Sequence, residues 1–230
     1  MALKHLVPLG VRNFLRPTYQ WAYAPIHRMT QSHAQWKQLR AELAEWERKG
    51  RPVPPPHIVK QQALRQYAAR YNLHVLVETG TYNGDMVEAM RAVFDRIYSI
   101  ELSKELYEKA RSRFRGVAHI ELMHGDSGSE LKGIMSALCQ PTLFWLDGHY
   151  SAGVTARGAK DTPIFEELNH ILTSTDLGHV IIIDDARCFG TEPAYPSIKE
   201  LCDYIKSHRS NVDIVIKDDS IRIIPLQIAE

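Results

Sequence analysis

From residue 74 onward the chain alternates short apolar runs with amphipathic stretches. The mostly apolar runs have the length of strands and lie at 75–77, 97–100, 119–123, 142–146 and 180–183. Stretches with helical spacing separate them at 85–94, 103–114, 127–138 and 162–173. Strands that are apolar on both faces must be covered on both sides, so the pattern predicts a parallel sheet between two layers of helices.

The C-terminal end departs from this alternation. The apolar runs 212–216 and 221–224 are separated by only four residues, which is too short for a crossover helix. We therefore expect an antiparallel hairpin there. The predicted fold class is α/β, with a doubly wound, mostly parallel, seven-stranded Rossmann-like sheet that ends in an antiparallel C-terminal hairpin.

A helical extension is predicted before the sheet. Apolar residues recur every three or four positions between residues 32 and 48, and a proline-rich segment at 51–56 can be neither helix nor central strand. A second helix is expected at 57–71. We predict an N-terminal arm, helix and linker over residues 1–56 and a main domain over 57–230.

Charge is distributed unevenly along the chain. Residues 1–40 contain six Lys and Arg and no acid, whereas the remaining 190 residues contain 22 basic and 27 acidic side chains. This balance argues against a nucleic-acid-binding surface. The basic arm, which also carries apolar residues, suits peripheral contact with an anionic membrane or a partner. It suits equally well packing on its own domain or on a second copy in a homo-oligomer.

Hydropathy and cysteine content indicate the cellular location that we expect for this protein. No run of 18 apolar residues occurs, so no transmembrane helix is expected. Three cysteines without C-x-x-C spacing favour neither a disulfide framework nor a zinc site. We expect a cytoplasmic protein.

Candidate chemistry lies after the strands, because ligands of open parallel sheets bind beyond the carboxyl ends. The loop after the first strand contains Glu78, Gly80, Thr81, Tyr82 and Gly84. It lacks the G-x-G-x-x-G spacing of dinucleotide-binding proteins, and its carboxylate would repel a phosphate and attract a cation. The alternative is a glycine-containing turn without a ligand.

Acidic residues also follow the next two strands. Glu101 stands where an acid commonly accepts hydrogen bonds from ribose hydroxyls. Asp126 could accept from an adenine amino group, although Asp126 or Ser127 could equally cap the following helix. Together the three strand ends suggest a ligand with an ammonium group, a ribose and an adenine, and without a phosphate.

These motifs resemble those of the class I S-adenosylmethionine-dependent methyltransferases, and the first loop resembles the E-x-G-x-Y-x-G loop of the metal-dependent catechol and caffeoyl-CoA O-methyltransferases. The resemblance covers about residues 57–227. It implies that Glu78 and the loop from Gly80 to Gly84 hold the methionine part of the cofactor. It further implies that Glu101 holds the ribose, and Asp126 with Ser127 the adenine.

Acids also follow the fourth and fifth strands. Asp147, Asp184 and Asp185 should converge, and a hard divalent cation such as Mg2+ would relieve their repulsion. The resemblance implies the same metal ligands, with Asp147 also beside the cofactor; the alternative is a set of polar turns. The related enzymes usually place a basic lysine three residues after the first acid, but Tyr150 stands here. His149, next to it, is the candidate base, with Asp147 as a second catalytic residue.

The predicted function is transfer of a methyl group from S-adenosylmethionine to an oxygen of a small-molecule acceptor, such as a sugar or a phenol, with Mg2+ assistance. The alternative is a non-catalytic nucleoside-binding or scaffolding module of the same fold. A nicotinamide-dependent oxidoreductase is disfavoured by the missing fingerprint.

Overall fold

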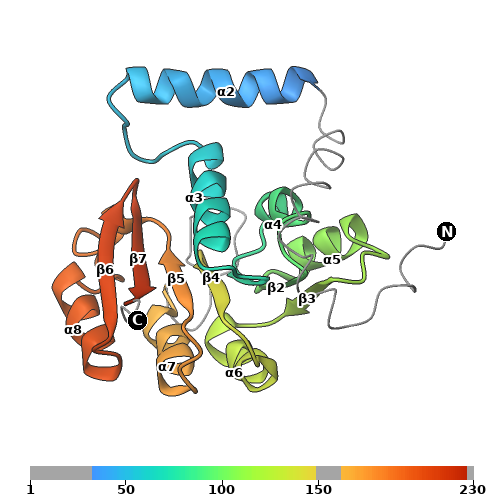
Figure 1. Ribbon diagram of the computed structural model, residues 1–230. Helices are drawn as coiled ribbons and strands as arrows, with labels where there is room; N and C mark the ends of the chain where they lie inside the picture. Colours follow the sequence, from blue (N-terminus) through green and yellow to red (C-terminus); the bar gives the residue numbers. More distant parts are fainter. Residues whose placement is uncertain (1–32, 149–161, 227–230) are drawn as a thin grey trace. The chain divides into compact units, whose positions relative to one another are not determined.

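The computed structural model describes residues 33–148 and 162–226 (Figure 1). The chain divides into two compact units, Met1–Glu45 and Trp46–Glu230. In the first unit the described part is most of helix α2 (His33–Arg48), which agrees with the predicted helix. The proline-rich segment lies in the second unit, where Pro52 accepts a hydrogen bond from the Trp46 indole at 2.8 Å. The domain boundary after residue 56 stays a prediction.

The second unit contains one seven-stranded sheet in the order β3-β2-β1-β4-β5-β7-β6. Strands β1 to β5 pair in parallel, and β7 runs antiparallel to both β5 and β6. The strands are β1 (Val75–Thr79), β2 (Arg96–Glu101), β3 (Ile120–His124), β4 (Thr142–Leu146), β5 (Val180–Ile183), β6 (Val212–Lys217) and β7 (Ser220–Pro225). The predicted fold class is confirmed.

The C-terminal hairpin is tighter than the hydrophobic pattern indicates. Its ladder extends to the pair Lys217–Ser220, so only Asp218 and Asp219 form the turn. Both have positive φ, 49° and 59°, the backbone conformation that matches the twist of two-residue hairpins. Pairing therefore continues past the apolar positions.

Six helices of at least one full turn accompany the sheet in the described part of the second unit. They are α3 (His57–Arg70), α4 (Asp85–Met90), α5 (Lys104–Arg113), α6 (Ser127–Ala137), α7 (Ile164–Thr173) and α8 (Ile198–His208). Helix α4 ends four residues before the predicted Phe94, which is nevertheless buried. Helix α8 was not predicted, although Ser197 and Glu200 form a capping box at its start.

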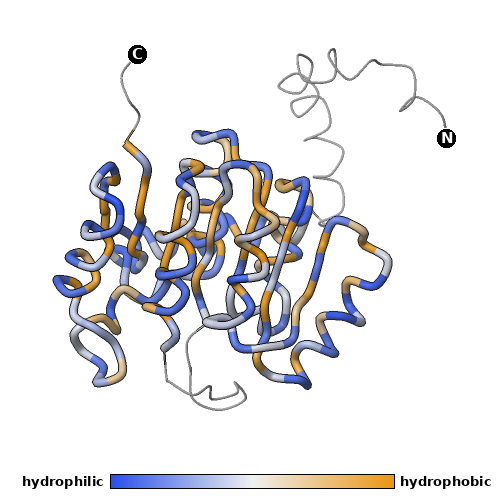
Figure 2. Tube along the Cα trace, turned by 90° about the horizontal axis from the view of Figure 1, so that it is seen from below, coloured by the Kyte–Doolittle hydropathy of each residue, from blue (hydrophilic) through white to orange (hydrophobic). Residues whose placement is uncertain are grey.

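Alternate residues of the central strands face opposite helical layers. Val77, Phe144 and Ile181 belong to a core with α6, α7 and α8. Leu76, Leu143 and Ile182 belong to a second core with α3, α4 and α5. The two layers lie on opposite sides of the sheet in Figure 1, and Figure 2 shows the strands as the most hydrophobic segments. The parity of a residue on β1, β4 or β5 therefore decides which layer it meets.

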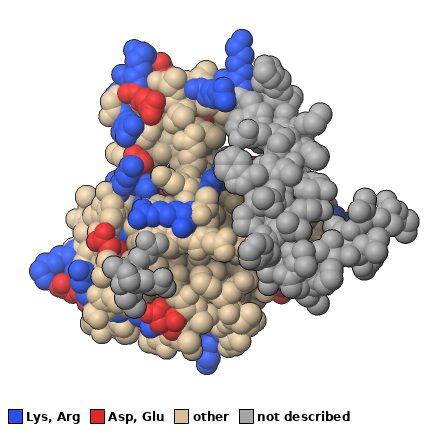
Figure 3. Space-filling view, viewed as in Figure 1, with Lys and Arg blue, Asp and Glu red and all other residues tan. Residues whose placement is uncertain are grey.

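The structure also bears on the predictions made from charge and hydropathy. No helix within residues 33–148 and 162–226 is long and apolar enough to cross a bilayer. Basic and acidic side chains are interspersed over the described surface seen in Figure 3. The part of the basic arm before residue 33, with its expected membrane, partner or self-association contacts, lies outside the described residues.

Candidate active site

The turn after β1 brings the chain unusually close to the end of β4. Gly80 has a φ of 81°, and a Cβ atom there would lie 2.3 Å from the carbonyl oxygen of Asp147. Gly84 has a φ of 77° and faces Phe114, whose ring a Cβ would approach to 2.7 Å. Both positions need glycine for conformation and for space. The turn thus keeps the ends of β1 and β4 in contact.

Glu78 lies fully inside this edge of the sheet. Its side chain accepts a hydrogen bond of 2.5 Å from the Ser99 hydroxyl, which also lies 2.6 Å from the Thr81 hydroxyl. Burial, together with the nearby carboxylate of Glu101, raises the pKa of Glu78 to about 8, although the Ser99 hydrogen bond opposes this. Glu78 is therefore mostly protonated at neutral pH.

Glu101, at the end of β2, is held by two backbone groups. Its Oε2 accepts from the amide of Tyr82 and its Oε1 from the amide of Ser103, both at 2.8 Å. These bonds orient the carboxylate beside the β1 turn, and each oxygen keeps a second acceptor position. Tyr82 itself has a φ of 50° and a half-exposed side chain. The structure thus brings Glu78, Glu101 and the β1 turn together as predicted.

Asp126 caps helix α6, which is one of the two roles that the sequence suggests for it. Its Oδ1 accepts from the amide of Gly128 at 2.8 Å. The adjacent Ser127 is buried and donates to Glu167 Oε1 at 2.5 Å. Asp126 and Ser127 thus lie where β3 ends, and the adenine contact stays a prediction.

Glu167, on α7, is a site residue that the sequence analysis missed. It is 1% exposed, it hydrogen-bonds Ser127 and the side chain of Thr79, and a Cβ at Gly148 would lie 3.1 Å from its Oε1. Burial raises its pKa to about 7 in spite of these hydrogen bonds. Its position on the apolar stripe of α7, between Ile164 and Ile171, is a signal that was available.

The ends of β4 and β5 place two of the predicted metal ligands side by side. The Asp147 amide donates to the Thr79 carbonyl at 3.2 Å, and the Asp184 amide donates to the Leu146 carbonyl at 3.0 Å. The ladder thus extends one residue past each strand. Asp184 is 1% exposed and Asp147 is partly buried. Burial and the charge of Asp184 together raise the pKa of Asp147.

A lysine that the sequence analysis did not consider lies against these carboxylates. Lys60, on α3, forms a hydrogen-bonded ion pair with Asp184 Oδ2, and its Nζ is 3.8 Å from Asp185 Oδ1. Burial alone would lower the pKa of Lys60, but the charges of Asp184, Asp147 and Asp185 outweigh it and raise the pKa. The ammonium therefore stays charged.

Asp185 is turned toward a second cation. Its backbone is left-handed, with a φ of 55°, at the start of the 3-10 turn Ala186–Cys188. Its Oδ1 accepts from Arg187 at 2.8 Å, and Arg187 also pairs with the buried Asp219 of the hairpin turn. Asp184 and Asp185 therefore each have a cationic partner.

This arrangement does not fit a divalent ion. An ion bound between Asp147, Asp184 and Asp185 would have to displace Lys60 from Asp184, and like charges so close repel strongly. Within the described residues, no group of three or more His, Cys, Asp or Glu side chains is arranged to hold a metal. The metal site stays a prediction, and the predicted base His149 lies outside the described residues.

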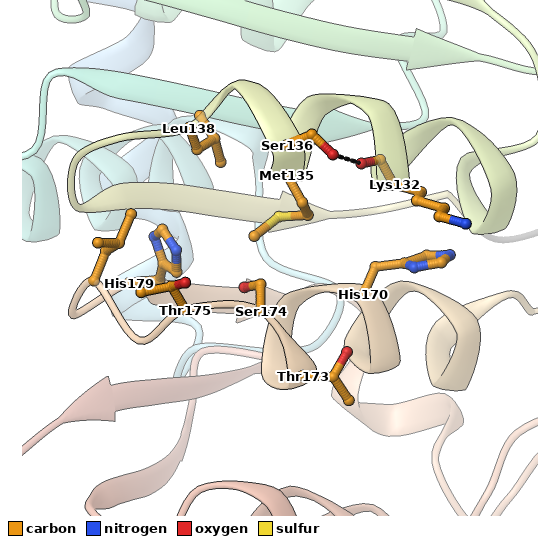
Figure 4. Close-up of a pocket in the computed structure, with 10 residues that line it drawn as sticks. Lys132, Met135, Ser136, Leu138, His170, Thr173, Ser174, Thr175 and His179 are labelled. Atoms are coloured by element: carbon orange, nitrogen blue, oxygen red, sulfur yellow. Dashed lines mark hydrogen bonds between the residues drawn. The ribbon is translucent and has the colours of Figure 1, made fainter.

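A separate cleft of about 540 Å³ lies between α6 and α7 (Figure 4). It contains none of the predicted site residues. Its His170 ring lies 2.8 Å from the Gly128 carbonyl, and burial lowers the pKa of its His179 to about 4, so that His179 is uncharged. The cleft offers no convergent acid-base pair, and the edge formed by β1, β2, β4 and β5 is the better candidate site.

Comparisons with known proteins identify the fold. No family model matches the chain, and no curated protein matches its sequence. Among solved structures, the chain is similar to an O-methyltransferase from Bacillus cereus in complex with SAH, with a TM-score of 0.53 and 14% identity over 82% of this chain and 90% of that one. It is also similar to the O-methyltransferase TomG from Streptomyces achromogenes in complex with SAM, with a TM-score of 0.55 and 17% identity over 85% and 90%.

The fold is that of the class I methyltransferases. In such an open parallel sheet the ligand site lies at the carboxyl ends of the strands. This is the edge where Glu78, Glu101, Asp147 and Asp184 are found. The fold and the distribution of buried carboxyl groups therefore indicate the same site.

The close approach at Gly80 leads to a first prediction. Gly80→Ala should lower the free energy of unfolding by about 2 kcal/mol or more, because the new Cβ would overlap the Asp147 carbonyl in a left-handed backbone. Chemical denaturation measures this. Gly133→Ala is the matched control: Gly133 lies within α6 with no neighbour inside 4 Å, and the change should stabilise by roughly 1 kcal/mol. Equal effects of the two changes would contradict the packing argument.

The buried Glu78 leads to a second prediction. Its pKa is higher in the folded chain than in the unfolded chain, so stability is lost as pH rises from about 4.5 to about 8. Glu78→Gln keeps an acceptor for Ser99 and cannot ionise. At pH 8 the variant should therefore be the more stable protein, by on the order of 3 kcal/mol. Urea titrations at pH 5 and pH 8 measure the difference, with the exposed Glu121→Gln as control. Parallel pH profiles for wild type and Glu78→Gln would refute the assignment.

Proposed function

We propose that this protein transfers a methyl group from S-adenosylmethionine to an oxygen of a small-molecule acceptor. The observation that carries the proposal is the pair of buried carboxyl groups, Glu78 and Glu101, at the adjacent ends of β1 and β2 beside a glycine turn. Ionisation of a buried acid is costly unless a cation lies beside it, and a carboxylate fixed by amides suits paired hydroxyls. An amino-acid ammonium and a ribose meet both needs.

The residues present fit this cofactor. Glu78 and the turn through Gly80, Thr81, Tyr82 and Gly84 would hold the methionine part, with Asp147 close to it. Glu101 would accept from the ribose hydroxyls. Asp126 keeps Oδ2 outside its capping bond, and with Ser127 it would border the adenine. The Glu101 carboxylate would also disfavour a phosphate at this position.

The bound cofactor would supply a methyl group on a sulfonium. The acceptor oxygen would attack the methyl carbon, so that an O–C bond forms as the S–C bond breaks and the sulfur leaves as a thioether. The protein's contribution is then to orient the acceptor and to take up its hydroxyl proton. Asp147 lies at the end of β4 with a raised pKa, which suits a proton acceptor. His149 stays the other predicted base. With the hydroxyl proton taken up by one of these residues, the products would be the methylated acceptor and a thioether.

The two rival functions use the same site differently. A scaffolding module would bind the nucleoside cofactor without turnover, whereas a nicotinamide-dependent oxidoreductase would bind a dinucleotide. The small-molecule acceptor, homo-oligomerisation, peripheral membrane contact and cytoplasmic location remain predictions, whereas the predicted Mg2+ dependence is at odds with the Lys60–Asp184 ion pair. Incubation with methyl-labelled S-adenosylmethionine and a panel of sugars, phenols and catechols separates these functions. Labelled product supports the proposal, and binding without transfer to any compound favours the scaffold.

Cofactor binding leads to a third prediction. S-adenosylhomocysteine should bind the wild-type protein in calorimetry, and NAD should not. Glu101→Ala should weaken S-adenosylhomocysteine binding by roughly 10- to 100-fold, because each charge-assisted hydrogen bond to the ribose is worth about 1.5 to 3 kcal/mol. Glu121→Ala, on the neighbouring strand β3 and paired with Arg96 at the surface, should leave the affinity unchanged. Unaltered binding in Glu101→Ala would remove this residue from the site.

A further inference from the structure

Lys60 reaches the ends of β4 and β5, which we call the candidate acceptor site, from helix α3, which precedes the first strand. Helix α3 packs on the same face of the sheet as Trp145 and Ile182. The Lys60 side chain is 17% exposed, and its Nζ lies 6.0 Å from the centre of the Trp145 ring. The long stem is thus packed over β4, and the ammonium reaches the ends of β4 and β5.

The contacts of the ammonium place it among the acids. It donates to Asp184 Oδ2 and lies 3.8 Å from Asp185 Oδ1, while the charge of Asp147 also acts on it. With Arg187 shared between Asp185 and Asp219, two cations face four carboxyl groups. The Lys60 ammonium occupies the Asp184 oxygen that a divalent ion would need, so a metal could bind there only by displacing the lysine.

The ion pair is a weak candidate for a purely structural role. Burying an ion pair costs desolvation free energy that the attraction only roughly repays, so an apolar pair of similar volume would stabilise the fold as well. Asp184 Oδ1 is moreover buried and has no hydrogen-bond partner within the described residues. The Lys60 ammonium keeps N–H donors beyond the one on Asp184, so it can donate a hydrogen bond to an acceptor oxygen.

We propose that Lys60, held by Asp184, supplies the positive charge of the acceptor site in place of a divalent metal ion. The inference rests on the proposed methyl transfer, and it makes that transfer independent of Mg2+. Lys60 would contact the acceptor oxygen directly and so orient it. Asp184 positions Lys60 by accepting its hydrogen bond.

Manganese binding tests the proposal without knowledge of the acceptor. Titration of Mn2+ followed by electron paramagnetic resonance should show no stoichiometric site in the wild-type protein. Lys60→Ala should bind one Mn2+ at least 10-fold more tightly than wild type, because the carboxylates lose their cation. Lys60→Arg keeps the charge and should behave as wild type. Lys199→Ala, which removes a lysine from an exposed ion pair with Asp203, is the matched control and should gain no site.

The opposite results would overturn the proposal. A one-to-one Mn2+ site in the wild-type protein that Asp184→Asn weakens would assign these carboxylates to a metal, and this arm needs no Lys60 variant to fold. An unchanged Mn2+ affinity in a folded Lys60→Ala protein would also refute it. Calorimetry with S-adenosylhomocysteine distinguishes failure of this proposal from failure of the proposed methyl transfer. If the wild-type protein does not bind S-adenosylhomocysteine, methyl transfer is contradicted, but the Mn2+ result still stands.

Discussion

Glu78, Asp147 and Asp184 stand on one face of three adjacent strands, and the free-energy cost of burying their carboxyl groups governs this edge of the protein. Each acid stands two residues after Leu76, Trp145 or Ile182, and so it faces the same side of the sheet. These three residues pack against α3, α4 and α5. The strand register therefore places all three acids under the same helical layer, with Asp147 level with Asp184 and Glu78 opposite Trp145. Each acid needs compensation, since an unpaired charge in such surroundings is expensive.

The protein compensates these charges in different ways. Glu78 keeps its proton and a hydroxyl partner, Glu101 uses two backbone amides, and Asp184 uses the ammonium of Lys60. Of these three acids, only Asp184 has a partner with a permanent positive charge among the described residues. Glu78 has none there, so a cation that bound beside it would stabilise its carboxylate. This contrast separates the β1–β2 side, suited to an ammonium and a ribose, from the β4–β5 side, where Asp184 already has a cationic partner.

The same compensation links stability to function. The raised pKa of Glu78 means that ionisation of this side chain destabilises the fold at alkaline pH, so a cation that bound beside it would return that free energy. Glu167, buried between α6, β1 and the start of the loop after β4, belongs to the same group of costly acids. Such strain is acceptable at a ligand site because the two large apolar cores on either side of the sheet support it.

The order of strands and helices was readable from the sequence, because the periods of two and 3.6 residues are local properties of the chain. The parallel sheet, the final hairpin and the polar strand ends around Glu78, Glu101 and Asp147 all follow from such local patterns. The close contact of Gly80 with Asp147 and the role of Glu167 depend instead on how elements pack. Lys60 shows this most clearly, since 124 residues separate it from Asp184. No spacing encodes that contact, and only the packing of α3 across β4 brings a cation to carboxylates that, taken by themselves, indicate a metal.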